Sequence, residues 1–444
     1  MEVKEAKVSL ARVEVTPGQV ATALIASVLG WALDLFDLFI ILYVAPTIAP
    51  LFFPSSLPTL SLASVYAAFG VTLLMRPAGS AIFGAYADKY GRKRAMVISV
   101  IGVGVATALM GAVPTIDQIG LVAPLLFLLL RLIQGIFVGG VVASTHTIGT
   151  ETAPPAWRGL FSGLIGAGGA GFGGLLASAI FFVISSLFPG ETFKHFGWRV
   201  MFFSGILSSI FGLFIFRSLE ESPLWKNLKI DTQAGQRAPL RTLLSRQYLR
   251  VVGANLMLVV GASTQYYLTS GYLPTFLALI NHLPKPQVGS LLVLSSLLII
   301  LTGPLAGHLS ELAGRKKLFL TVGIINLILI PILYFKLSRL DAKVVLDTSH
   351  IRWLVLALTV CGNASYAPIL VFLNERFPTR IRATGTAVSW NVGFAVGGMM
   401  PTFATVTSPG ISALPRHVVS FLVGAIVIYI VGALVVPETR GRLE

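Results

Sequence analysis

Charged residues are scarce in this chain, and cysteine is almost absent. Only 11% of the 444 residues are Asp, Glu, Lys or Arg, against roughly a quarter in ordinary soluble domains. With 55% hydrophobic residues, a soluble fold would have too little polar surface to stay dispersed, so this class is excluded. The single cysteine, Cys361, excludes an intrachain disulfide and argues against a cysteine-based metal site or redox centre.

Long apolar stretches recur along the whole chain. Many of them reach the ~20 residues that a helix needs to cross the ~30 Å hydrocarbon layer of a bilayer. They predict an all-α membrane protein with twelve transmembrane helices, approximately at residues 20–48, 61–87, 95–113, 120–150, 159–186, 198–216, 251–277, 286–310, 318–338, 352–375, 384–407 and 416–437. The first stretch is longer than a signal-peptide core and lacks its cleavage pattern, so we expect it to be retained.

One polar segment divides these helices into two groups of six. Residues 217–250 lie between the sixth and seventh predicted spans and hold seven Lys or Arg residues. We therefore expect an N-terminal six-helix bundle at 1–216, a cytoplasmic linker at 217–250 and a C-terminal six-helix bundle at 251–444.

Lys and Arg are unevenly distributed among the loops. The N-terminus, the even-numbered loops and the C-terminus hold 23 of the 33, and the other loops hold 8. Because cytoplasmic loops carry the excess of positive charge, both termini are expected in the cytoplasm. The net charge of +15 then needs no nucleic-acid partner, since contact with anionic membrane lipids accounts for it.

Two loop motifs recur in the second half of the chain. The loop around Asp88 reads G-A-Y-A-D-K-Y-G-R-K-R, and the loop around Glu311 reads G-H-L-S-E-L-A-G-R-K-K. These two acids stand 223 residues apart, and a second pair, Glu151 and Glu375, stands 224 residues apart. Two motifs at nearly the same offset indicate a duplication in which both halves have the same orientation.

The first of these loops resembles the signature of the major facilitator superfamily. Further matching segments are R-L-I-Q-G from Arg131, E-E-S-P from Glu220 and P-E-T-R-G from Pro437. The resemblance covers essentially the whole chain. It implies two pseudo-symmetric six-helix bundles and secondary active transport by alternating access.

Two further segments point to branches of this superfamily. R-P-A-G from Arg76 is similar to the metabolite:proton symporters, and W-A-L-D-L-F-D from Trp31 is similar to the sialate, lactate and aromatic-acid:proton symporters. Several relatives have an acid directly after the Gly-Gly pair of span four, where this chain has Val141. This departure weakens a phosphate assignment in particular, and any proton coupling must use other groups.

Ionisable side chains far from the predicted loops are few. Asp34 and Asp37 in span one, Arg76 in span two and Arg131 in span four fall near the bilayer midplane, where alternating-access carriers place their sites. Each costs ~2.5–3.5 kcal/mol to insert, so each is a functional candidate. We expect Asp34 or Asp37 to exchange a proton while Arg76, Arg131 or both bind a substrate carboxylate. The alternative is a static network of ion pairs that fixes helix packing.

Other residues have more specific expected roles. His146 would relay a proton inward, or else be satisfied by a backbone carbonyl. Substrate contacts are expected from polar side chains on spans four, seven and eleven, namely Gln134, Gln265, Tyr266 and Asn391. By the resemblance, the charged residues of the repeated loops form a cytoplasmic gate, made of Asp88, Arg92, Glu151, Glu311, Arg315 and Glu375. The alternative is that the positive charge of these loops only determines the orientation of the helices in the membrane.

These observations predict a transporter and not an enzyme. No metal-ligand spacing and no Ser-His-Asp arrangement can be placed at one depth, and we expect no metal and no cofactor. The predicted function is proton-coupled symport of a small organic anion by a monomer in the plasma membrane. A uniporter or exchanger without proton coupling is the alternative within transport, and a membrane sensor or receptor is the alternative of another class. Monocarboxylates, aromatic acids, sugar acids, dicarboxylates and phosphate all remain candidate substrates.

Overall fold

The computed structural model consists of helices joined by short turns and loops in the residues that it describes. These are residues 17–441 apart from 91, 152, 155–156, 219–242, 244, 343–347 and 379–380, and for some helical residues only the backbone is described. No strand occurs in this part of the chain, in agreement with the predicted all-α class. Most of the predicted linker, 217–250, lies outside the described residues, so the domain boundaries stay a prediction.

The first six predicted spans each coincide with one helix or one run of helices. Spans one to four are α1 (Pro17–Phe52), α2 (Pro58–Tyr90), α3 (Arg92–Ala112) and α5 (Val122–Glu151), with the short α4 (Ile116–Ile119) before α5. Span five is α6 (Arg158–Gly163), the π-helical turn η2 (Leu164–Gly168) and α7 (Gly169–Leu187). Span six is α8 (Trp198–Phe203), after the π-helical turn η3 (Phe193–Gly197), with α9 (Gly205–Ser218).

The last six predicted spans are matched in the same way. Span seven is α12 (Arg246–Tyr266), the π-helical turn η4 (Tyr267–Gly271) and α13 (Leu273–Leu279). Spans eight to ten are α14 (Lys285–Ala313), α15 (Arg315–Ser338) and the pair α16 (Ser349–Tyr366) and α17 (Ile369–Arg376). Spans eleven and twelve are α18 (Arg382–Val406) and α19 (Leu414–Val435), with a 3-10 turn, η5 (Ile411–Ala413), between them.

Length and composition make most of these helices membrane-spanning candidates. Within the described ranges, nine helices or helix runs are long and apolar enough to cross a bilayer. The predicted spans three, six and eleven are not among the nine; the segment Val97–Ala112 of α3 forms a shorter apolar helix in the described ranges. Outward faces are apolar: on α14, Leu301, Leu305 and Leu312 are each more than half exposed, as a lipid-facing surface requires.

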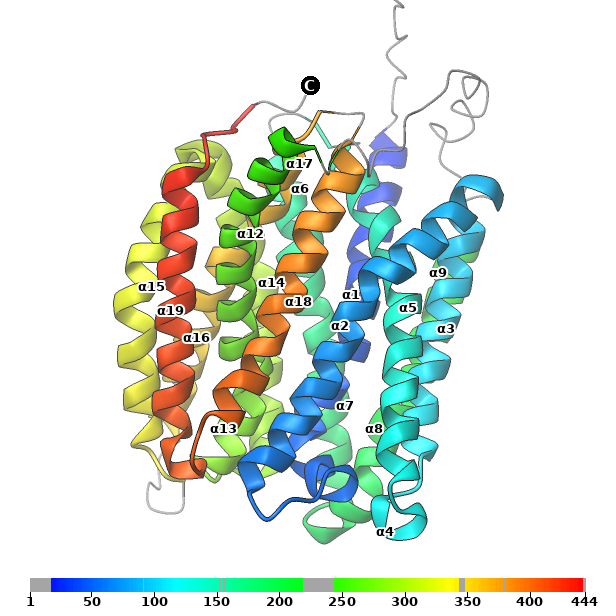
Figure 1. Cartoon of the computed structure of the whole chain (residues 1–444), viewed down its shortest axis with the longest axis vertical. Coiled ribbons are helices and arrows are strands. Elements are labelled where there is room, and N and C mark those ends of the chain that lie inside the picture. The colour runs from blue at the N-terminus through cyan, green and yellow to red at the C-terminus, as the bar shows by residue number, and fades with distance from the viewer. Residues whose placement is uncertain are drawn as a thin grey trace, which may run out of the picture.

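The helices form two groups that stand side by side. Figure 1 shows most of α1 to α9 on the right, α12 to α19 towards the left and α6 near the centre, with the start of α1 and the end of α19 at the same end of the molecule. The groups meet where α2 packs along α18 and where α7 packs along α14. Helix α1 also contacts η4 and α13, so the middle of the first span faces the second half of the chain.

Glycine allows span five to approach its neighbours closely. A Cβ atom on Gly173 would lie 2.4 Å from the carbonyl oxygen of Ala32 in α1, and one on Gly171 would lie 3.0 Å from that of Ser296 in α14. Small residues permit such backbone contact between membrane helices. This glycine-rich run therefore joins the two halves.

Candidate functional site

Helices α2 and α5, which carry Arg76 and Arg131, are closely packed in the first half. A Cβ atom on Gly139 would lie 2.2 Å from the carbonyl oxygen of Arg76, and Ser80 Oγ donates a hydrogen bond to the Gly139 carbonyl at 2.8 Å. On the next turn, Thr72 Oγ1 donates to the Arg131 carbonyl at 3.2 Å. Small residues such as Gly139 permit this close approach of the two helices.

Arg76 forms an ion pair with the first acid of α1. Its Nη2 atom lies 3.2 Å from Asp34 Oδ2 and donates a hydrogen bond to Asp34 Oδ1 at 3.3 Å. The Asp34 and Arg76 side chains are 1% and 3% exposed. Burying two charges costs free energy that only their mutual attraction offsets. Removal of either partner therefore leaves an uncompensated buried charge and strongly destabilises the protein.

Asp37 and Arg131 are held by neutral partners, and, like Asp34 Oδ2 and Arg76 Nε of the ion pair, some of their polar atoms have no hydrogen-bond partner among the described residues. Asp37 Oδ2 accepts a hydrogen bond from Ser208 Oγ of α9 at 2.8 Å, and Arg131 Nη1 donates to Gln134 Oε1, whose Nε2 atom donates to Thr107 at 2.7 Å. Both side chains are buried. Among the residues described, Asp37 Oδ1 and the Nε and Nη2 atoms of Arg131 have no hydrogen-bond partner.

Unpaired polar atoms at this depth are chemically significant. A buried donor or acceptor without a partner costs about 1–3 kcal/mol, and more when it is charged. Two free nitrogens on one guanidinium match the two oxygens of a carboxylate. Asp37, with one free oxygen, can take up a proton. The first half therefore offers an anion-binding group and a proton-accepting group close together.

The second half contributes the predicted Gln265, Tyr266 and Asn391. Gln265 is turned into its own half: it donates to the Gly261 carbonyl at 3.1 Å and accepts from Asn326 at 2.7 Å. Tyr266 Oη and Asn391 Oδ1 are buried and have no partner in the described part of the chain. Tyr266 and Asn391 are thus available to a solute, whereas the amide of Gln265 is already occupied.

A group of aromatic rings lies at the centre, and the sequence analysis did not recognise it as a unit. Trp31 lies 5.6 Å from Trp390 between ring centroids, and its Nε1 atom donates to Tyr366 Oη at 3.3 Å. Tyr266 is stacked on Tyr366 at 5.1 Å and lies 6.2 Å from Phe39. We call these residues, with Phe394 at 4.1 Å from Trp390, the central aromatic cluster.

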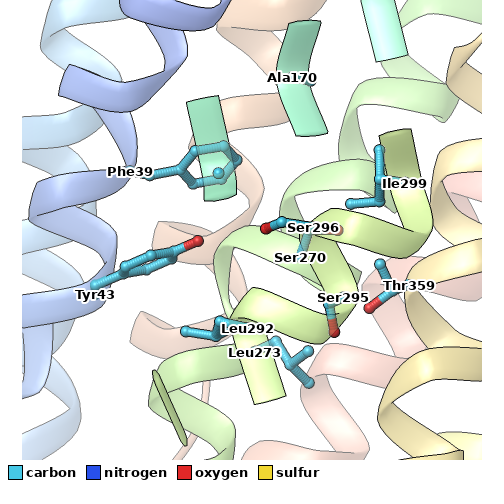
Figure 2. A pocket seen from close by; sticks show the side chains of 11 residues that line it. Phe39, Tyr43, Ala170, Ser270, Leu273, Leu292, Ser295, Ser296, Ile299 and Thr359 are labelled. Atoms are coloured by element: carbon cyan, nitrogen blue, oxygen red, sulfur yellow. The ribbon is translucent and has the colours of Figure 1, made fainter. Parts of the chain in front are cut away.

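A pocket lies beside this cluster, between α1, α7, α13, α14 and α16. Phe39 and Tyr43 form one wall, and hydroxyl groups of Ser295 and Thr359 lie on the other side (Figure 2). Both hydroxyl oxygens are buried and lack a partner in the described ranges. Because Phe39 belongs to both, the pocket gives the cluster adjacent free space at the boundary between the two halves.

Three of the predicted gate residues are brought together. Arg315 Nη2 lies 2.6 Å from Glu311 Oε2 and 3.0 Å from Glu375 Oε1, and Arg315 Nε donates to Glu375 Oε2 at 3.2 Å. Glu311 Oε2 also accepts a hydrogen bond from the backbone N–H of Gly159, in the first half, at 3.1 Å. This charge network therefore ties the two halves together at the end where α19 finishes (Figure 1).

The C-terminal segment belongs to the same network, which sequence reasoning missed. Thr439 Oγ1 donates to Glu375 Oε2 at 2.7 Å, and the Glu438 carboxylate accepts from the N–H groups of Arg315 and Lys316 at 2.9 and 3.1 Å. Burial raises the pKa of Glu438, but four backbone N–H donors outweigh it and hold this pKa below its ordinary value. The P-E-T-R-G motif was the available signal.

The remaining predicted residues lie outside the part of the chain whose side chains are described. They are His146, Asp88, Arg92 and Glu151. The proton-relay role of His146 and the first-half side of the gate stay predictions.

The geometry of buried charges between two helical halves agrees with the comparison to known families. The model of the Major Facilitator Superfamily matches residues 20–402 and, in a second overlapping match, 255–441. The chain belongs to the major facilitator superfamily. It is a multi-pass membrane transporter and not an enzyme, with the twelve-helix architecture of this superfamily.

Relatives of known name span most of the chain. The inner membrane metabolite transport protein YhjE of Escherichia coli (strain K12) is 31% identical over 390 residues, which is 86% of each chain. A putative proline/betaine transporter of Staphylococcus aureus (strain COL) is 31% identical over 416 residues, 90% of this chain and 86% of the relative. The glycine betaine/proline/ectoine/pipecolic acid transporter OusA of Dickeya dadantii (strain 3937) is 28% identical, covering 87% of this chain and 77% of the relative.

The fold has counterparts among solved structures. The crystal structure of a D-xylose-proton symporter has a TM-score of 0.71 at 19% identity and covers 95% of this chain and 99% of that chain. At this identity the match shows the fold alone. The one relative named as a metabolite transport protein agrees with the R-P-A-G motif, whereas the likeness of span one to sialate, lactate and aromatic-acid symporters stays a prediction.

Proposed function

We propose that this transporter is a symporter that couples a proton to a small solute carrying a carboxylate group. The observation that carries the proposal is the buried Arg131, whose free Nε and Nη2 atoms lie in the half that also holds the unpaired Asp37 oxygen. In this scheme Arg131 binds the carboxylate in a bidentate manner. Asp37 takes the proton. Asp34 and Arg76 neutralise each other as an ion pair and so add no net charge to the site.

Coupling follows from electrostatics. A carboxylate in a buried site is held in its ionised form by a nearby guanidinium and favours protonation when that guanidinium is taken away. A solute that engages Arg131 competes with Asp37 for this positive charge and so favours proton uptake by Asp37. For a solute with a net negative charge, solute and proton then cross together, because the empty site and the doubly loaded site are the two arrangements with balanced charge.

The relatives support the carboxylate, but they widen the class of solute. Betaine and proline, for which several relatives are named, are zwitterions that carry a carboxylate, whereas the predicted substrate was an organic anion. The carboxylate is the feature common to both. Under this proposal both termini lie in the cytoplasm, the two bundles at 1–216 and 251–444 move against each other, and a monomer in the plasma membrane is the working unit.

Charge-neutral substitution of the two aspartates tests the proposal. In proteoliposomes with an imposed pH gradient, Asp37→Asn should abolish accumulation of the solute while solute exchange at equal pH continues, because Asn keeps an oxygen acceptor for Ser208. Asp117→Asn, at an exposed position of α4, is the matched control and should accumulate normally. If Asp34→Asn and Asp37→Asn both accumulate solute like the unaltered protein, the proton role of these aspartates is wrong; if the unaltered protein itself does not accumulate solute in the pH gradient, the transporter is a uniporter or exchanger.

A further inference from the structure

A chain of buried hydrogen bonds leads from Arg131 on α5 to the side of Asp37. Arg131 Nη1 donates to Gln134 Oε1, and Gln134 Nε2 donates to Thr107 Oγ1 of α3 at 2.7 Å. Thr107 in turn meets Asp37 at Gly205 of α9, where an added Cβ atom would lie 2.6 Å from Thr107 Cγ2 and 3.1 Å from Asp37 Oδ1. The chain therefore begins at the group proposed to bind the carboxylate and ends beside the group proposed to take the proton.

The direction of each hydrogen bond in this chain follows from its chemistry. A guanidinium has only donors, so Arg131 holds the oxygen end of the Gln134 amide and turns the nitrogen end towards Thr107. The Thr107 hydroxyl thus receives a hydrogen from Gln134 and gives its own hydrogen to the Val103 carbonyl at 2.8 Å. Because a hydroxyl has one hydrogen and two lone pairs, Thr107 has a lone pair left to offer to Asp37.

A lone pair on Thr107 serves only the protonated form of the Asp37 carboxyl. Asp37 Oδ2 already accepts from Ser208 Oγ at 2.8 Å, whereas Oδ1, the oxygen on the side of Thr107, has no partner in the described ranges. An ionised carboxylate only accepts hydrogen bonds, but a protonated one donates its O–H. A proton on Oδ1 would therefore be donated to Thr107 Oγ1, and the unpaired oxygen of Asp37 would gain a partner.

The charged groups around Asp37 decide what this hydrogen bond must oppose. Arg131 attracts the ionised form of Asp37, and Asp34 repels it but is itself paired with Arg76 of α2. The segments α7, η2, η4 and α13, which also contact α1, carry no Asp, Glu, Lys, Arg or His. Arg199 of α8 is bound to carbonyl groups at the end of α3. The charge that competes with protonation of Asp37 is therefore that of Arg131, the group at which the chain begins.

We propose that Thr107 is the hydrogen-bond acceptor for protonated Asp37, and that Gln134 is the residue that holds Thr107 in this orientation. This inference rests on the proposed function, since it presupposes that Asp37 takes up the transported proton. When a carboxylate occupies Arg131, the attraction of Arg131 for ionised Asp37 is neutralised, and the acceptor on Thr107 then favours the protonated form. Thr107 and Gln134 are thus positioning residues, and Gln134 acts through Arg131 instead of by the solute contact predicted from the sequence.

Infrared difference spectroscopy of the purified protein follows the protonation of Asp37 without a transported solute. A protonated carboxyl has a C=O stretching band that the ionised form lacks, and Asp37→Asn identifies the band of Asp37 in a pH titration of the unaltered protein. Thr107→Val keeps the shape of the side chain and removes the acceptor. We expect the midpoint of the Asp37 band to move by about one pH unit towards acid, as the loss of one buried hydrogen bond to the protonated form requires.

Three further variants separate this role from a general effect on packing. Thr107→Ser keeps the hydroxyl and should keep the midpoint. Gln134→Leu leaves the Thr107 hydroxyl free to turn its hydrogen towards the ionised carboxylate, so the midpoint should again move towards acid; this variant is the independent test if Thr107→Val fails to fold. Thr302→Val on α14 is the matched control, because Thr302 Oγ1 donates in the same way to the Leu298 carbonyl at 2.8 Å, and it should leave the midpoint unchanged.

The outcomes distinguish this inference from the function on which it rests. If Thr107→Val leaves the midpoint unchanged or moves it towards alkaline pH, or if Thr107→Ser moves it equally far, the assignment of Thr107 is wrong while proton uptake by Asp37 stands. If the unaltered protein has no band between about pH 5 and about pH 9 that Asp37→Asn removes, Asp37 takes up no proton in the working range, and both the assignment and the proposed function are wrong.

Discussion

Replacing Arg315 by methionine probes the charge network that Arg315 forms with Glu311 and Glu375. The guanidinium of Arg315 is fully buried, within 2.6 Å of Glu311 Oε2 and 3.0 Å of Glu375 Oε1, and its Nη1 atom donates to Ser310 Oγ at 2.6 Å. Methionine removes the charge and all of these hydrogen bonds while it fills much of the same space. The Glu375 carboxylate, with a side chain 2% exposed, is left without a cation.

The structure sets the size of the expected effect. Removing one partner of a buried ion pair costs about 3–5 kcal/mol, because the remaining charge is buried and uncompensated. Glu311 is partly exposed and Thr439 still donates to Glu375, so we expect ~3 kcal/mol, the lower end of this range. The double variant Arg315→Met/Glu375→Gln has no orphaned charge at Glu375 and should recover about 2 kcal/mol of this loss.

A double-mutant cycle measures this coupling. The free energies of unfolding of the unaltered protein, Arg315→Met, Glu375→Gln and the double variant are obtained by denaturant titration in mixed micelles. If Arg315→Met costs less than about 1 kcal/mol, or if the double variant is no more stable than Arg315→Met alone, the network contributes little to closing this end of the transporter and our argument from burial is refuted.

Three further predictions concern packing and pH. Gly139→Ala should lower both the thermal midpoint and solute uptake, because the new Cβ atom would lie 2.2 Å from the Arg76 carbonyl; Gly18→Ala, with nothing within 4 Å, is the control, and equal behaviour of the two contradicts the close helix contact. Gly314→Ala should destabilise the protein by roughly 1 kcal/mol or more, since Gly314 has φ of +98°, and an unchanged thermal midpoint would count against this. The pKa of Glu438 is lower in the folded protein than its ordinary value of 4.5. The ionised carboxylate therefore stabilises the fold at pH values above 4.5, and this stabilisation is lost as the pH falls through the folded-state pKa. Glu438→Gln should therefore lose less thermal stability than the unaltered protein between about pH 5 and about pH 3; parallel losses would show that Glu438 does not contribute.

The sequence by itself determined the class of protein and its helices. Each predicted span coincides with a helix or a run of helices, because the length of an apolar stretch and the scarcity of charge are local properties that bilayer thickness dictates. The same reasoning identified Asp34, Asp37, Arg76 and Arg131, since a charge inside an apolar span stands out without any knowledge of its neighbours.

Only the tertiary structure decided which of these groups are paired and which are free. Asp34 faces Arg76 and Asp37 faces Ser208 because of how α1 is rotated against α2 and α9. Gln265, predicted as a substrate contact, instead bonds to Asn326, and rings from four helices meet at the centre. Such contacts join residues up to hundreds of positions apart, and the rotation of each helix is fixed by backbone contact at glycines, which a linear hydrophobic pattern does not encode.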